Sequence, residues 1–275
     1  MKFSGIKGMK AEDFRRLTGV KSSTFNRMVE ILRVAEQEKN SLGGKPNALS
    51  MEDRLLMSLE YLREYRTYFH IAQGYGVSES TCYRNIRWIE NTLVDHPDFA
   101  LPGRKALIKS DMSYEVVLID ATETPIERPK KKQRRFYSGK KKRHTLKSQI
   151  VVDKRSKQII CTAFTHGKRH DFRLFKESDT RIHPQTQAVT DTGYQGITKI
   201  HSNSRHPKKK SQKTPLSKLD KQVNQSLASE RVLNENVIGM IKRFKIIADR
   251  YRNRRKRFGL RFNVIAGIYN FEINS

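Results

Sequence analysis

The first hundred residues place apolar side chains at helical spacing. Met28, Val29 and Leu32 share one face of a helix that opens at the serine pair 22–23, and either serine can cap it. This pattern predicts an N-terminal helical segment over residues 1–45.

A second helical unit begins at Ser50-Met-Glu-Asp53, which has the form of a capping box. Further along, Ile71-Ala72 is followed by Gly76 at a tight turn and by Ser78 as a helix cap. This order is typical of a helix-turn-helix, whose second helix enters the major groove of DNA. We therefore expect a DNA-binding domain over residues 46–100.

The second of these helices, predicted over residues 79–94, offers Arg84, Asn85 and Arg87 as outward-facing candidates. Arg and Asn carry forked donors that match the edges of guanine and adenine. The alternative is an ordinary helical hairpin with no DNA role.

After a Pro- and Gly-containing linker near residues 96–103, the pattern changes to short apolar runs typical of strands. Helical spacing returns only later. The expected strands are 116–119, 149–152, 159–164 and 187–190, and the expected helices are 171–177 and 229–250. Strands with interleaved helices predict an α/β domain over residues 113–275.

Two of the expected strands run directly into aspartates, Asp120 and Asp191. A carboxylate at the edge of a sheet is costly unless it is paired, and a metal ion is one way to stabilise it. A single strand-ending Asp is more often a turn residue or a cap. Two of them, with a suitable Glu downstream, make a stronger case for a metal site.

Glu235 lies in the last predicted helix, on the border of its apolar stripe. Arg231, Glu235 and Lys242 fall within about a 40° arc at 100° per residue, whereas Glu230 points away from Glu235. Carboxylate oxygens with open positions suit Mg²⁺, and Mn²⁺ as a substitute. Two such ions would activate the attacking oxygen and stabilise the leaving oxygen of a phosphodiester.

The net charge of the chain indicates what kind of partner the protein binds. The chain has 56 Lys and Arg against 28 Asp and Glu, a net charge of +28. Such an excess favours binding to the phosphate backbone of nucleic acid, although a ribosomal type of RNA binder or a solvated basic surface would show the same total. The basic residues that follow the first aspartate are the candidates for contacts to DNA: Lys140, Lys141, Lys142, Arg143 and Lys147.

Three segments together resemble the DDE domain of bacterial insertion-sequence transposases, in particular insertion-sequence family five and the related Harbinger transposases. The resemblance extends from about residue 114 to 271. The segments are Asp120-Ala-Thr-Glu-Thr-Pro-Ile-Glu-Arg-Pro129, Tyr137-Ser-Gly-Lys-Lys-Lys-Arg-His-Thr-Leu-Lys147 and Asp191-Thr-Gly-Tyr-Gln-Gly196.

This resemblance implies a ribonuclease-H-like fold in which Asp120, Asp191 and Glu235 are the catalytic acids and hold two Mg²⁺ ions. It also matches Arg231 and Lys242 to the Arg and Lys of the family's Tyr-Arg-Glu-Lys signature, as contacts to DNA. The chain departs from that signature at Ala228, where the family has Tyr.

The expected function is therefore that of a transposase in the bacterial cytoplasm, at the nucleoid. Its partners would be the double-stranded terminal repeats of the element and target DNA, both bound by a homodimer. No membrane partner is expected. Two alternatives remain open: a metal-dependent endonuclease that never joins DNA, and a non-catalytic DNA-binding repressor.

Overall fold

The structure is a computed structural model that describes residues 2–41, 43, 46–109, 114–210 and 215–274. The chain divides into two compact units. The helical unit comprises Met1–Ala100, Ile241–Asp249 and Arg257–Ser275, and the sheet unit comprises Leu101–Met240 and Arg250–Lys256. The predicted boundary positions 45 and 113 lie outside the described residues.

The helical unit is built from helices at both ends of the chain. Its helices are α1 (Ala11–Thr18), α2 (Ser22–Ser41), α3 (Met51–Arg63), α4 (Tyr68–Tyr75), α5 (Glu79–Asp95), α9 (Lys245–Ala248) and α10 (Phe258–Asn274). The predicted cap of α3 is confirmed, because the Ser50 hydroxyl accepts a hydrogen bond from the Asp53 amide at 3.1 Å. The Asp53 carboxylate does not complete the capping box and accepts instead from the Phe3 amide at 2.7 Å.

The helix-turn-helix signals also appear as predicted. Gly76 ends α4 with φ 67°, a left-handed conformation that favours glycine. The Ser78 side chain then accepts from the Thr81 amide and starts α5.

The helix α10 contributes core residues to the helical unit. Phe262, Val264, Ile265 and Ile268 are all fully buried. Gly267 allows close approach, since a Cβ there would lie 1.9 Å from the carbonyl oxygen of Phe99. The C-terminal helix is therefore an integral part of this unit.

The sheet unit is a mixed α/β structure. Its strands are β1 (Val116–Pro125), β2 (Tyr137–Ser138), β3 (Arg143–Asp153), β4 (Ile159–His166), β5 (Gln187–Thr190) and β6 (Ser204–Arg205). β1 pairs antiparallel with β3 and parallel with β5, β4 is antiparallel to β3, and β6 is parallel to β5. All four predicted strands are present, three of them longer than the apolar runs alone.

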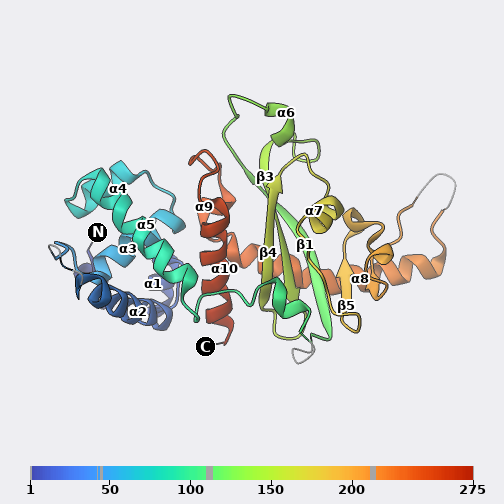
Figure 1. The fold of residues 1–275 in the computed structure, drawn as a ribbon, viewed down its shortest axis with the longest axis horizontal. Helices are drawn as coiled ribbons and strands as arrows, with labels where there is room; N and C mark the ends of the chain where they lie inside the picture. Colours follow the sequence, from blue (N-terminus) through green and yellow to red (C-terminus); the bar gives the residue numbers. More distant parts are fainter. Residues whose placement is uncertain (1, 42, 44–45, 110–113, 211–214, 275) are drawn as a thin grey trace. The chain divides into compact units, whose positions relative to one another are not determined.

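Two helices cover the two faces of this sheet (Figure 1). On one face, Val117 and Ile119 pack with Phe175 of α7 (Asp171–Glu177). On the other, Leu118 and Val189 pack with Leu227 of α8 (Lys218–Ile241). The alternation along β1 thus decides which of its residues face α8.

The last predicted helix needs correction. It was expected over residues 229–250, but α8 begins at Lys218 and ends at Ile241, and the short α9 follows. Residues from Ile241 onward, except 250–256, cluster with the helical unit. None of the described helices is long and apolar enough to cross a bilayer.

Candidate active site

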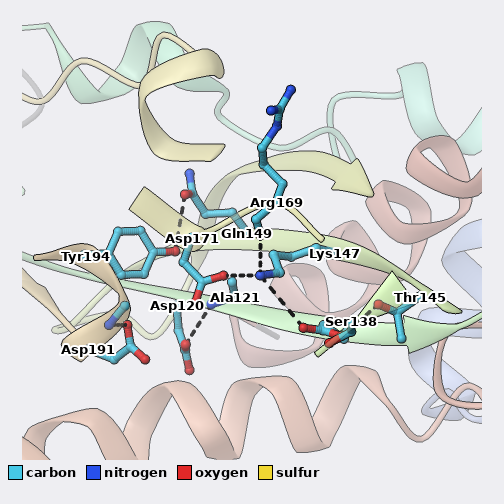
Figure 2. A network of polar contacts seen from close by, with 12 residues as sticks. Asp120, Ala121, Ser138, Thr145, Lys147, Gln149, Arg169, Asp171, Asp191 and Tyr194 are labelled. Carbon is cyan, nitrogen blue, oxygen red and sulfur yellow. Dashed lines mark hydrogen bonds and ion pairs between the residues drawn. The ribbon is translucent and has the colours of Figure 1, made fainter. Parts of the chain in front are cut away.

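Asp120 and Asp191 come together because two parallel strands are in register. Ile119 of β1 pairs with Thr190 of β5, so the next residue on each strand is one of the two aspartates. Neighbouring strands lie about 4.8 Å apart, which makes these residues direct neighbours. Figure 2 shows both carboxylates pointing to the same side of the sheet. The alternation of β1 and β5 makes this the face that α8 covers.

The protein does little to neutralise this pair of charges. The pKa of the Asp120 carboxyl is raised to about 6, chiefly by burial and to a smaller extent by the charge of Asp191. A hydrogen bond from the Ala121 amide, 2.7 Å from Asp120 Oδ1, and the guanidinium charge of Arg231 act in the opposite direction. Two neighbouring carboxylates with so little compensation suit a bound cation.

A third carboxylate, Asp171, lies beside this pair. It is the first residue of α7, and its charge also raises the pKa of Asp120. A Cβ at Gly193 would lie 2.7 Å from Asp171 Oδ2 and 2.9 Å from Asp191 Oδ1. Gly193 therefore lets the two carboxylates approach each other, and its amide donates to Asp191 Oδ1 at 2.8 Å.

Lys147 holds Asp171 in place. Its ammonium group donates to Asp171 Oδ1 and to the Arg169 carbonyl, each at 2.6 Å, and lies 3.8 Å from Glu123 Oε1 (Figure 2). The Lys147 side chain is only 9% exposed. The prediction that Lys147 contacts DNA is therefore wrong for this structure, because its charge is buried between carboxylates.

Asp120, Asp171 and Asp191 together form what we call the acidic edge, and the charges of all three act on the aromatic residue Tyr194. It is fully buried, and its hydroxyl donates to Gln149 Oε1 at 3.3 Å. Burial raises the pKa of the phenol, and the charges of all three aspartates add to the shift. Tyr194 thus stays neutral while lying in the field of the whole acidic edge.

Glu235, the third predicted acid, is an exposed residue of α8. It lies one turn beyond Arg231, about 40° further round the helix. Glu230 is engaged elsewhere, 2.8 Å from Lys154 Nζ and 3.3 Å from an Arg205 nitrogen. In the described part of the chain, no three His, Cys, Asp or Glu residues are placed to hold one metal ion. Among the described residues, the structure thus places Asp120 beside Asp191, and Glu235 does not form a metal-ligating group with them.

The residues predicted to contact DNA divide into exposed and buried groups. Arg84 and Arg87 are exposed on α5, and Arg87 donates to the Tyr83 hydroxyl at 3.1 Å. Asn85 is 4% exposed, and its Oδ1 accepts from Arg54 Nε at 2.9 Å and from the Asn47 amide at 3.0 Å. The prediction that Asn85 faces outward is wrong.

The remaining basic candidates lie in the turn between β2 and β3 and near the end of α8. Lys140, Lys141, Lys142 and Arg143 are all exposed. Lys142 has a left-handed backbone, φ 52°, which tightens the turn that presents these charges. Lys242 follows the end of α8, is half-buried and clusters with the helical unit.

Asp171 is the functional candidate that the strand-ending pattern missed. Asp171 is the first residue of a helix, so the pattern that predicted Asp120 and Asp191, an apolar strand followed by Asp, does not include it. A signal that could have pointed to Asp171 is the pair His170-Asp171, which resembles a His-Asp pair at the end of the third strand in the same family.

Comparisons with known proteins identify the family of the chain. A model of the family described as DDE superfamily endonuclease matches residues 119–270, and one described as the helix-turn-helix of that superfamily matches residues 47–99. A probable transposase for insertion sequence element IS702 from Microchaete diplosiphon is 45% identical over 99% of each chain. A putative transposase for insertion sequence element IS112 from Streptomyces albus G is 26% identical over 84% of each chain.

No solved structure matches the chain. The first family match covers more than half of the 275 residues and contains the acidic edge as well as α8. The chain therefore belongs to the DDE superfamily of endonucleases, and its residues 47–99, which include α3, α4 and α5, match the helix-turn-helix of that superfamily.

Proposed function

We propose that this protein is a transposase that binds the ends of an insertion sequence, cuts the DNA strand there and joins it to target DNA. The observation that carries the proposal is the side-by-side placement of Asp120 and Asp191, directly after the parallel pairing of β1 and β5 ends. Whole-length similarity to a protein described as a probable transposase supports it.

The strand arrangement supports a ribonuclease-H-like fold for the sheet unit. Three antiparallel strands, β4, β3 and β1, continue into the parallel strands β5 and β6. In this arrangement the acids lie where β1 and β5 end their pairing, on the face covered by α8. The two carboxylates would hold divalent cations there.

Mg²⁺, with Mn²⁺ as a substitute, fits the hard oxygen ligands of Asp120 and Asp191. When two ions are bound, they supply Lewis-acid activation of the attacking and leaving oxygens. Glu235 would complete the ligand set if the flank of α8 approached the acidic edge upon DNA binding. Arg231, whose charge already acts on Asp120, would contact a phosphate of the cleaved strand, and Lys242 another.

The remaining basic residues would position the DNA. Arg84 and Arg87 are exposed on the second helix of the helix-turn-helix, where they can reach base edges. The turn residues 140–143 would contact backbone phosphates. Two DNA ends have to be joined in one reaction, so we propose a homodimer acting on DNA at the bacterial nucleoid.

The test uses labelled element ends, Mg²⁺ and a target plasmid. Asp120→Asn, Asp191→Asn and Glu235→Gln should each abolish cleavage and joining while keeping affinity for the ends within about twofold. Glu230→Gln is the matched control on α8, because Glu230 is ion-paired with Lys154 and Arg205, and it should retain activity.

The same experiment separates the alternatives. Cleaved but never joined ends would identify an endonuclease, and binding without Mg²⁺-dependent cleavage would identify a repressor. Full cleavage by Glu235→Gln would remove that residue from the ligand set.

A further inference from the structure

The two exposed arginines in the middle of α5 are held in different ways. Arg84 Nε donates to the backbone carbonyl of Ser80, on the same helix, at 3.3 Å. Arg87 Nη1 donates instead to a side chain, the Tyr83 hydroxyl, at 3.1 Å, and the Arg87 guanidinium carbon lies 5.9 Å from the centre of the Tyr83 ring. Both Tyr83 and Arg87 are exposed, so this contact orients the arginine and leaves it open to solvent.

The Tyr83 ring is itself fixed by an aromatic cluster of the helical unit. It meets the ring of Tyr68, from α4, edge to face, with centroids 5.5 Å apart and planes at 82°. Tyr68 in turn stacks on Tyr61 of α3, with centroids 4.6 Å apart and planes at 16°. Aromatic pairs favour such arrangements, and Tyr61 is buried in the core. The partner of Arg87 is therefore a ring with a rigid support.

The C-terminal helix α10 supports the same cluster. Arg261 Nη2 donates to the Tyr68 hydroxyl at 3.1 Å, and the Arg261 guanidinium carbon lies 4.9 Å from the centre of the Tyr61 ring. Arg261 is buried, and its Nε lies 2.7 Å from Oε1 of Glu90 on α5. Glu90 lies about two turns after Tyr83 on the same side of this helix. Thus α10 holds α5 directly at Glu90 and, through Tyr68, at Tyr83.

A guanidinium held in this way still has donors for a base. Arginine has five N–H groups, and Nη1 carries two of them, so the bond to Tyr83 uses one and leaves the other, together with both hydrogens of Nη2. Neighbouring donors of this kind match O6 and N7 of guanine in the major groove. Ordering a flexible side chain upon binding costs entropy, and a side chain that is already oriented avoids much of that cost.

We propose that Tyr83 positions Arg87 to read a guanine in the element end, and that Tyr83 thereby sets part of the sequence specificity of the protein. The inference rests on the proposed binding of element ends by α5. Tyr83 acts through Arg87 and needs no contact of its own with the DNA. A purely structural role would affect every DNA alike, whereas a positioning role affects only DNA that presents this guanine.

The test measures fluorescence anisotropy of the full chain in EDTA, with the element end and with a scrambled duplex of the same length and composition. Arg87→Ala should weaken binding to the element end about 5–150-fold, the range for one bidentate base contact. Tyr83→Phe keeps the ring and removes only the hydroxyl. It should weaken binding to the element end about 2–12-fold, the range for ordering one side chain, and change binding to the scrambled duplex less than about twofold.

The double variant Tyr83→Phe, Arg87→Ala separates positioning from packing. If Tyr83 acts through Arg87, this variant should bind the element end as weakly as Arg87→Ala and no more weakly. Thr92→Val is the matched control, because it removes a hydroxyl of the same helix that donates to the Trp88 carbonyl at 3.0 Å, and it should change neither affinity. Additive losses in the double variant would overturn the inference, as would an equal loss for both DNAs in Tyr83→Phe.

The identity of the base is tested with 7-deazaguanine, which has a carbon in place of the N7 acceptor. An element end with this base at every guanine should bind the wild type about fivefold more weakly, and the loss should be smaller for Arg87→Ala. An equal loss in both proteins would overturn the assignment to guanine. None of these comparisons involves cleavage, so the inference and the catalytic role of Asp120 can fail separately.

Discussion

At the scale of single residues, the acidic edge should cost stability when no metal is bound. Asp120 has a pKa near 6 in the folded chain against an ordinary 3.8, chiefly through burial. The folded state thus holds this proton more tightly than the unfolded chain does. The free energy of unfolding should therefore fall as pH rises from about 4 to about 6, and stay low above that range.

Asp120→Asn should consequently stabilise the metal-free protein. We expect a gain of about 2–3 kcal/mol at pH 7.5 and about 1 kcal/mol less at pH 5, because the destabilised carboxylate is absent. Urea unfolding in EDTA at the two pH values measures this difference. Glu115→Gln, at an exposed carboxylate, is the control and should change neither value. A gain independent of pH would contradict the argument.

Lys147 offers the opposite case, a buried cation whose removal should destabilise the fold. Lys147→Met would leave Asp171 and Glu123 without their positive partner, at a cost of about 3–5 kcal/mol. The measurement is urea unfolding beside DNA affinity, with Lys141→Met as the exposed counterpart. If Lys147→Met weakened DNA binding at unchanged stability, its burial between carboxylates would not describe its role.

At the scale of elements, the spacing of apolar residues predicted the existence of helices and strands better than it predicted their ends. Four strands (β1, β3, β4 and β5) and α7 follow from apolar runs and caps in the sequence, whereas the two-residue strands β2 and β6 do not. The start of α8 did not, because residues 218–228 have few apolar positions: Leu219 and Val223 are exposed and Leu227 is buried. Its end at Ile241 depends on which unit the following residues join, and that is a tertiary effect.

The candidate site shows the same limit. Asp120 and Asp191 were predictable, because an apolar run followed by Asp needs only local sequence, although β1 continues beyond Asp120 to Pro125. The contribution of Asp171 depends on Gly193 and Lys147, which lie far from it in sequence. The burial of Asn85 likewise depends on Arg54 and Asn47, so the residue type alone suggested a base contact that its packing excludes.

Arg84 and Asn85 are neighbours on α5 with opposite surroundings, and their alanine variants should separate recognition from folding. Arg84→Ala removes an exposed donor and should weaken binding to the element ends about 5–150-fold at unchanged stability. Asn85→Ala removes the acceptor of the buried Arg54 guanidinium and of the Asn47 side-chain amide, and should cost about 1–3 kcal/mol of stability. DNA titration measures the affinity of both variants, and urea unfolding measures their stability. A loss of stability in Arg84→Ala would contradict the role of Arg84 as an exposed contact to DNA.

At the scale of the whole molecule, the chain crosses between its two units four times, at 100/101, 240/241, 249/250 and 256/257. The sequence suggested one domain after another, because patterning is local and reports nothing about which distant segments pack together. Buried ion pairs join the ends of the helical unit: Glu90 on α5 accepts from Arg261 and Arg257 of the C-terminal segment. Glu272 on α10 accepts from Arg15 and Arg243.

This connectivity predicts that residues 1–100 do not form a stable DNA-binding domain by themselves. Without α10, the fragment exposes the core that Phe262 and Ile265 cover and leaves Glu90, 1% exposed in the full chain, without its arginines. An unpaired buried carboxylate alone costs about 3–5 kcal/mol, a large part of the stability of a small domain. Near-ultraviolet circular dichroism and urea unfolding of the fragment should show no cooperative transition, whereas a fragment with residues 257–275 joined through a flexible linker should recover one. Cooperative unfolding of residues 1–100, with the full chain's affinity for the element ends, would mean that α10 is dispensable to this unit.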